Sequence, residues 1–432
     1  MFSPSSRVSS LLPFVGRRGK FIPQGSMLVL ADIKPDEHDA LQRELEQIGI
    51  ELQSRSDALF HRSTTTHYAA WMILPGASDS HDAGSAPDRL LLETNYDGQF
   101  EEHLRDLVAQ CGSAIDRVYA HCQNYPAEGS HSPKAVEAFF RARHQDTSKM
   151  PTAHYVGLPG RSVPDIRNAI AVYEEAKDFL DRFDHASDVD SIERALVAHF
   201  RNSPASAPKR FAITQAGLRH LLVYNLILGF PLMIIYVLLN WAPLCLLARY
   251  FEGKEARNDR RHPPWDPTAH AEIYSHLDLA AQNHLCTVAT VKPGWFRMLV
   301  AKRALALGRI LASKFFILGR LDQMNTVHFA RWILIGRELL FVGNYDGSWS
   351  GYLGDFSDQA WGVNLIWSNT IGFPPTRFLT RGGAQNLDAF ETQALTHYAP
   401  APVFYSAYPG YPQANIVRIL EFRDALAKKL GI

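Results

Sequence analysis

Alternating apolar and polar positions mark short strands in both halves of the chain, with helical spacing between them. In the second half, stretches rich in Val, Ile, Phe, Tyr and Trp predict four strands, at 285–291, 326–335, 338–345 and 402–408. The predicted order within each half is strand, helix, strand, strand, helix, a polar stretch, strand and helix. This order is typical of a ferredoxin-like βαββαβ unit.

The two halves also resemble each other in sequence. Four blocks match in the same order: MLVLADIKP (27–35) with LCTVATVKP (285–293), TTHYAAW (65–71) with TVHFARW (326–332), RLLLETNYDG (89–98) with ELLFVGNYDG (338–347), and HYVGLPG (154–160) with FYSAYPG (404–410). The spacing between blocks differs because the first half carries an additional polar loop, SDSHDAGSAPD. We interpret the matches as an internal duplication.

The duplication predicts the domain organisation. We expect an α+β fold with two ferredoxin-like repeats, at 27–185 and 284–432, whose sheets pair into a fused α+β barrel. Residues 1–26 are predicted to form a basic flexible tail, and 186–283 a helical linker with a membrane segment at 218–250.

An uncharged apolar run at 221–247 separates the two repeats. It is long enough to span a bilayer, but a single span would place the repeats on opposite sides of the membrane. Pro231 and Pro243 would bend a helix. Positive charge on both sides of the run favours keeping both ends cytoplasmic; the residues are Lys209, Arg210, Arg219, Arg249, Lys254, Arg257, Arg260 and Arg261. A single span stays open, but we favour monotopic insertion into one leaflet.

A second segment, 295–321, is both basic and apolar and contains no acidic residue. Such a helix suits the surface of an anionic membrane. The helix at the matched place in the first half, DEHDALQRELEQIGIEL at 36–52, is acidic. A buried core helix whose cations reach back to water is the alternative explanation.

Composition narrows the class of protein. The net charge at pH 7 is zero, which gives no indication of nucleic-acid binding. The four cysteines have no C-x-x-C spacing, so a reducing compartment is favoured. The apolar stretch near the amino end is too short for a signal peptide. Walker, dinucleotide-binding, zinc-protease and nucleophile-elbow motifs are all missing, so kinase, dehydrogenase and hydrolase functions lose support.

The strands at 326–335 and 338–345 predict a hairpin that turns at Gly336-Arg337. This register pairs Phe329 with Asn344 and Val327 with Asp346. Side-chain alternation then sorts the hairpin into two faces. The polar face carries the candidate catalytic residues Arg331, Asn344 and Asp346. The aromatic face carries the candidate cofactor-binding residues His328, Trp332 and Tyr345, together with Phe341, and suits a planar cofactor or helix packing equally well.

Each of the three main candidates has two interpretations. His328 is a haem axial ligand or general base, or else a structural histidine, because His67 repeats it. Asp346 is a catalytic carboxylate or the N-cap of the following helix. Arg331 matches Ala70 in the first half, so it is interpreted as a partner for an anionic group such as a carboxylate or a haem propionate, or as part of a salt bridge.

Uncharged amides and aromatics elsewhere in the second half suggest a polar pocket in an apolar shell. These candidate substrate-pocket residues are Gln282, Asn283, Trp367, Asn369, Arg377 and Tyr405. Loop and capping roles explain them equally well.

The element order resembles the dimeric α+β barrel superfamily, which includes haem proteins such as dye-decolourising peroxidases and chlorite dismutases. NYDG is similar to the Gly-x-x-Asp-Gly loop of the peroxidases in its last two residues but lacks the leading Gly. The resemblance implies a haem cofactor and peroxidase-like chemistry. We therefore predict a membrane-bound, monotopic oxidoreductase on the cytoplasmic face that acts on an apolar, lipid-derived substrate and can form a homo-oligomer. The alternative is a non-catalytic lipid-binding or scaffold protein.

Overall fold

The computed structural model describes residues 24–55, 59–76, 87–146, 150–182, 188–202, 223, 225–258, 281–314, 326–358 and 360–431. The predicted basic tail lies outside the described residues up to residue 23. The same holds for most of the polar loop, for residues 315–321 of the predicted basic helix, and for the basic residues Lys209, Arg210, Arg219, Arg260 and Arg261.

The first half follows the predicted order of strands and helices. Its elements are β1 (Gln24–Asp32), α2 (His38–Ser54), β2 (Thr66–Leu74), β3 (Arg89–Asp97), α3 (Phe100–Tyr119), α4 (Pro133–Arg143), β4 (Thr152–Val156), α5 (Val163–Leu180) and α6 (Val189–Asn202), with 3-10 turns at Leu59–Arg62 and Gly129–His131. A π-helical turn, Asn225–Gly229, then leads into α8 (Phe230–Asn258).

The second half repeats this order. Its elements are β5 (Gln282–Thr290), α10 (Trp295–Lys314), β6 (Val327–Ile335), β7 (Glu338–Asp346), α11 (Trp349–Asp358), α12 (Ala360–Trp367), a small hairpin β8 (Thr376–Arg377) and β9 (Arg381–Gly382), a 3-10 turn Gly383–Gln385, α13 (Leu387–Thr396), β10 (Val403–Ser406) and α14 (Gln413–Leu430). The four predicted strands of this half are confirmed, with ends that shift by a few residues.

The strands form two four-stranded antiparallel sheets, with orders β1-β3-β2-β10 and β4-β6-β7-β5. Each sheet takes three strands from one half and the fourth strand from the other, because β10 pairs with β2 and β4 pairs with β6. Gly157 follows β4 at a close approach, since a Cβ atom there would lie 2.3 Å from the carbonyl oxygen of Val327. The fold is α+β, as predicted.

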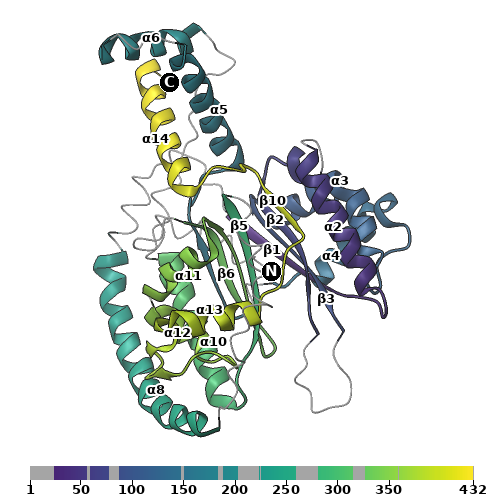
Figure 1. The fold of residues 1–432 in the computed structure, drawn as a ribbon, viewed down its shortest axis with the longest axis vertical. Coiled ribbons are helices and arrows are strands. Elements are labelled where there is room, and N and C mark those ends of the chain that lie inside the picture. The colour runs from purple at the N-terminus through teal and green to yellow at the C-terminus, as the bar shows by residue number, and fades with distance from the viewer. Residues whose placement is uncertain are drawn as a thin grey trace.

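The two sheets lie face to face between two layers of helices. Figure 1 shows α2, α3 and α4 covering the outside of the first sheet, and α10 to α13 covering the second. The helices α5, α14 and α6 project together from one end of the sheets. An apolar cluster from both sheets, including Leu28, Met72, Leu91, Ile333 and Leu340, packs between them. Each sheet therefore buries both faces, which explains why its strands are almost continuously apolar.

The predicted register of the β6–β7 hairpin is confirmed from the turn as far as Phe329, which pairs with Asn344. The predicted pairing of Val327 with Asp346 is wrong, because a bulge at His328 pairs Val327 with Tyr345 instead. A bulge adds one residue to one strand, so it reverses the faces of the side chains beyond it. His328 consequently leaves the aromatic face to which simple alternation assigns it.

The apolar run lies mainly in α8, along the outer edge of the second half (Figure 1). The carboxyl-terminal part of α8 is bound to the domain by two acidic side chains. Glu255 accepts hydrogen bonds from the buried guanidinium of Arg297 at 2.6 and 2.7 Å, and Glu252 accepts backbone N–H bonds from Phe378 and Leu379 at 2.9 Å. Among the described residues, no helix has the length and apolar character of a membrane span.

We call β4 and β10 the exchanged strands, because each pairs with a strand of the other half. A buried ion pair joins α5 and α14, the helices that follow them. Arg423 of α14 lies 2.7 Å from Asp165 of α5, and both side chains are fully buried. Arg423→Ala removes this bond to the buried carboxylate of Asp165, which keeps Arg161 at 3.1 Å. We therefore predict that the substitution lowers the free energy of unfolding by about 1.5–3 kcal/mol. Chemical denaturation measures the change. The control, Arg418→Ala, removes an exposed arginine of the same helix and should cost less than about 0.5 kcal/mol.

Candidate functional site

A histidine–aspartate pair occupies the same place in each half. In the second half, the Nε2 atom of His328 lies 2.7 Å from a carboxylate oxygen of Asp346, the last residue of β7. The other carboxylate oxygen accepts the backbone N–H of Gln413, the first residue of α14, at 2.6 Å. Gln282, the first residue of β5, lies 3.3 Å from the same Nε2 atom and donates to the carbonyl of Tyr411 at 2.8 Å.

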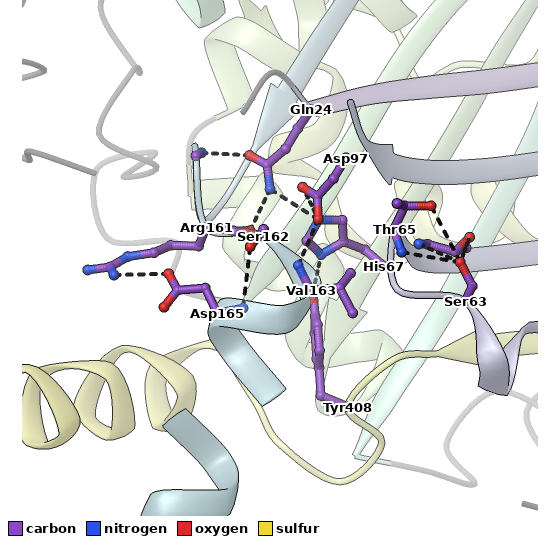
Figure 2. A network of polar contacts seen from close by, with 12 residues as sticks. Gln24, Ser63, Thr65, His67, Asp97, Arg161, Ser162, Val163, Asp165 and Tyr408 are labelled. Carbon is purple, nitrogen blue, oxygen red and sulfur yellow. Dashed lines mark hydrogen bonds and ion pairs between the residues drawn. The ribbon is translucent and has the colours of Figure 1, made fainter. Parts of the chain in front are cut away.

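Figure 2 shows the matching pair in the first half, with His67 between Asp97 and Tyr408. The Nε2 atom of His67 lies 2.9 Å from Asp97, whose second oxygen accepts the backbone N–H of Val163 at the start of α5, at 2.7 Å. The Nδ1 atom lies 2.9 Å from the hydroxyl of Tyr408. With Nε2–H donating to the carboxylate, Nδ1 accepts from this hydroxyl.

Tyrosines connect the two pairs inside the protein. The hydroxyl of Tyr408 is hydrogen-bonded to that of Tyr68, and Tyr68 accepts from Gln282 at 3.1 Å. Burial raises the pKa of both tyrosines well above the usual value, so both hydroxyls stay protonated. Both imidazoles are buried as well. The result is a row of buried polar contacts that runs from Asp97 through His67 and the two tyrosines to Gln282, which lies beside His328.

The arrangement favours a structural role for both pairs. Asp346 caps a helix, as one interpretation of the sequence expected, but the helix is α14 rather than the adjacent α11. Asp97 caps α5 in the same manner. Each carboxylate thus satisfies a helix N-terminus and holds a histidine at the crossing point of an exchanged strand.

A second polar cluster lies between the two sheets. Three side-chain bonds cross the gap: Arg331 donates to the backbone oxygen of Ser26 at 3.1 Å, Asn95 donates to Asn344 at 3.0 Å, and His284 lies 2.8 Å from Glu93. Asn95 also donates to Glu93 at 3.0 Å. We call these six residues, with His154 beside Arg331 on β4, the inter-sheet polar layer.

The inter-sheet polar layer contains an unusual number of unpartnered atoms. Five buried polar atoms have no hydrogen-bond partner among the described residues: Arg331 Nε, Asn344 Nδ2, Ser26 Oγ, His154 Nε2 and His284 Nδ1. Burial lowers the pKa of Arg331 to about 10, although Glu93 acts to raise it, so the guanidinium is charged at neutral pH. Burial and Arg331 together lower the pKa of His154 well below its usual value, which keeps this imidazole neutral.

An apolar groove lies on the other face of the second sheet. It has a cavity volume of about 140 Å³ and is bounded by α10, α12, β4 and β6. Small residues leave the space open, among them Ala304 and Gly308 on α10 and Gly362 on α12. Trp332 supplies a polar atom in the lining, because its indole Nε1 is buried without a partner among the described residues. Such a lining suits an apolar molecule with one acceptor group.

The structure brings together some of the predicted site residues and separates others. Arg331 and Asn344 lie in the inter-sheet polar layer, whereas Asp346 lies with His328 at the strand ends. Trp332 lines the apolar groove, and Tyr345 stacks on Tyr352 with ring centroids 4.2 Å apart. The predicted catalytic and cofactor-binding sets therefore divide among several places.

The predicted substrate-pocket residues also lie apart. Gln282 belongs to the His328 pair, and Asn283 donates to the carbonyl of Gly347 at 2.9 Å. Trp367 lines a small cavity beside the apolar groove, and Asn369 caps the end of α12 through the carbonyl of Leu365 at 2.9 Å. Arg377 is exposed on β8, and Tyr405 accepts a hydrogen bond from Arg167 at 2.8 Å in the core of the first half.

Several residues of the two sites escape sequence reasoning. Glu93 and Ser26 join the inter-sheet polar layer only because the sheets face each other. In the sequence, each of these residues is recognisable as a charged or polar residue in an otherwise apolar strand. In the part of the chain that the structure describes, no group of three or more His, Cys, Asp or Glu residues is placed to hold a metal ion.

The structural role of the His–Asp pairs is testable by mutation. Asp346→Ala leaves the N–H of Gln413 and the imidazole of His328 without their carboxylate, so we predict a loss of about 2–4 kcal/mol in the free energy of unfolding. Denaturation by urea measures it. Glu421→Ala removes an exposed carboxylate from α14 and should leave stability nearly unchanged. Equal stability of both variants would contradict the structural role.

Comparisons with protein-family models, with curated proteins and with solved structures found no match for this chain. Its function is therefore argued from the geometry of the sites above.

Proposed function

We propose that this protein lies on a membrane surface and binds an apolar, lipid-like molecule in the apolar groove between α10 and α12. The observation that carries the proposal is an exposed apolar face on α8, which is bound to the groove-lining helix α10. Large apolar side chains are exposed along α8 and on the residues just before it: Val223, Leu226, Ile227, Phe230, Ile234, Ile235, Leu238, Leu239, Leu246, Leu247 and Tyr250.

This face is too long and too apolar for an ordinary surface helix. Leu239 is 73 % exposed and Leu246 is 71 % exposed. A patch of this kind marks an interaction surface. Its neighbours favour lipid as the partner, because Arg249 and Lys254 on α8 and Lys302, Arg303 and Arg309 on α10 are also exposed. Cations beside an apolar face suit anionic head groups above an acyl layer.

The helix α10 connects the membrane face with the groove. Its first turn is bound to α8 through Arg297 and Glu255, and Phe296 stacks on Phe251 with ring centroids 4.4 Å apart. Its middle part, from Ala304 to Ala312, lines the groove. A lipid-derived molecule would therefore bind next to the surface from which it comes.

We also propose that the two halves are duplicated ferredoxin-like units whose facing sheets form a fused α+β barrel. Support comes from the matched sequence blocks, the common strand order and the two equivalent His–Asp pairs.

The oxidoreductase hypothesis requires a haem ligand, and the surroundings of His328 do not fit one. Asp346 engages its Nε2 atom, and the residue is 2 % exposed. The rings of Tyr68 and Tyr408 pack 5.2 and 6.2 Å from the imidazole. An axial ligand needs a free nitrogen facing the space of a porphyrin. The non-catalytic, lipid-binding alternative is therefore the better supported function, and a Soret band that disappears in His328→Ala would reverse this preference.

The groove is tested by filling it. Gly362 lines the groove, and a new Cβ atom there meets nothing within 4 Å, so Gly362→Phe adds a bulky side chain at a position where the backbone tolerates one. We predict at least a tenfold loss of affinity for a fluorescent long-chain fatty acid, about 1.4 kcal/mol, measured by titration. Gly354→Phe is the matched control, since Gly354 lies on α11 in equally open space outside the groove. Unchanged binding in Gly362→Phe, or equal loss in both variants, would exclude the groove as the site.

The membrane face is tested with vesicles. Each large side chain that leaves water contributes about 1.5–3 kcal/mol. We therefore predict that Leu239→Glu combined with Leu246→Glu abolishes co-sedimentation with vesicles of mixed neutral and anionic lipid. Ile50→Glu, at an isolated exposed residue of α2, should co-sediment like the wild type. Wild-type protein that stays in the supernatant would contradict the proposal.

A further inference from the structure

The inter-sheet polar layer lies on the opposite face of β6 from the lipid-binding groove proposed above, and of its members only His154 also borders that groove. Alternation along β6 places Trp332 toward the groove, and its neighbours Arg331 and Ile333 toward the facing sheet. The same alternation directs five more members of the layer toward the facing sheet: Ser26, Glu93, Asn95, His284 and Asn344. Apolar residues two positions away on the same strands, such as Leu28, Leu91, Cys286 and Val342, pack between the sheets. The layer therefore converges on one space between the sheets.

Pairing registers show how close these side chains are within each sheet. Ser26 pairs with Asn95 in the first sheet. In the second sheet, His284 pairs with Asn344, and His154 pairs with Arg331. Directly paired residues have Cβ atoms about 5 Å apart. Together with the three bonds that cross the gap, this places all the unpartnered atoms in a single cluster.

The fold itself does not require charge in this layer. The matched sequence blocks align Arg331 with Ala70, Glu93 with Val342, and His284 with Ser26. Ala70 and Val342 belong to the apolar cluster between the sheets, so small or apolar residues pack well at these positions. Only the asparagines, Asn95 and Asn344, occur in both halves, and they bond to each other. The charged residues are thus specific to one half of each pair.

The unpartnered atoms define what the layer can bind. Arg331 Nε and Asn344 Nδ2 can only donate, and Ser26 Oγ can donate or accept. These three atoms carry the donor character of the layer. Glu93, the acidic member, is already bonded to His284 and Asn95. Leaving a buried donor unpartnered costs about 1–3 kcal/mol, so a partner rich in acceptor oxygens is favoured.

We propose that the inter-sheet polar layer is a binding site for a small oxyanion, a carboxylate or phosphate group, anchored by the guanidinium of Arg331. The anion accepts from Arg331 Nε and Asn344 Nδ2, and from the hydroxyl of Ser26. It meets the buried positive charge of Arg331. Charge-assisted bonds of this kind are the strong ones in a protein interior.

The test is the thermal unfolding midpoint of the full-length protein in acetate, in inorganic phosphate and in chloride at equal ionic strength. A ligand that binds only the folded state raises the midpoint with its concentration. We expect a rise over chloride in one of the two oxyanions, which also tells a carboxylate site from a phosphate site. Arg331→Met should abolish this rise, and Ser26→Ala, which removes one oxygen and keeps the fold, should give a smaller rise than the wild type.

The control is Arg418→Met, which removes an exposed arginine and should keep the full rise. Midpoints that are equal in all three salts would overturn the proposal. An equal rise in the wild type, Arg331→Met and Ser26→Ala would overturn it as well, since the anion would then act elsewhere. Neither result depends on the groove or on membrane binding, so the two proposals fail separately.

Discussion

The fourth strand of each sheet comes from the other half of the chain, and this exchange holds the two halves together. Because β4 completes the sheet of the second half and β10 that of the first, neither sheet is complete without both halves. Each exchanged strand is followed by a helix that begins at the aspartate of its own half. The His–Asp pairs therefore lie at the points where the chain leaves an exchanged strand and enters the next helix. Tyr408 and Tyr68 lie between the two pairs.

Facing sheets create the second defining feature, an interior that is partly polar. Hydrophobic burial alone would fill the space between the sheets with aliphatic side chains, as the apolar cluster does at one level. At the level of Arg331 the same space holds charged and amide groups, which are costly to bury unless they are paired. Apolar residues fill the space between the sheets at one level, and they also occupy positions that match Arg331 and Glu93 in the other half. The fold therefore does not require charged residues there, whereas binding of a ligand would.

The second half differs from the first in its outer layer as well. In the first half, α2 is an acidic surface helix, with Arg117 of α3 bonded to Glu44 and Glu51. In the second half, α10 is basic, is joined to the apolar α8, and lines a groove. One sheet thus has an ordinary solvated cover, whereas the other has a cover suited to lipid. The proposed functions follow this asymmetry rather than the symmetry of the fold.

The sequence by itself determined the α+β class, the strands of the second half and the turn at Gly336-Arg337, because alternation and turn chemistry are local properties. It also placed Arg331 and Asn344 together on one polar face of the hairpin. Only the tertiary structure decided that Glu93 and His284 join them, since residues 191 positions apart meet only when the sheets face each other. The same holds for the bulge at His328, where the carboxylate of Asp346 and the start of α14 draw the imidazole away from the face that alternation assigns to it. Local pattern fixes which face a residue prefers, but the pairing of distant strands fixes what that face meets.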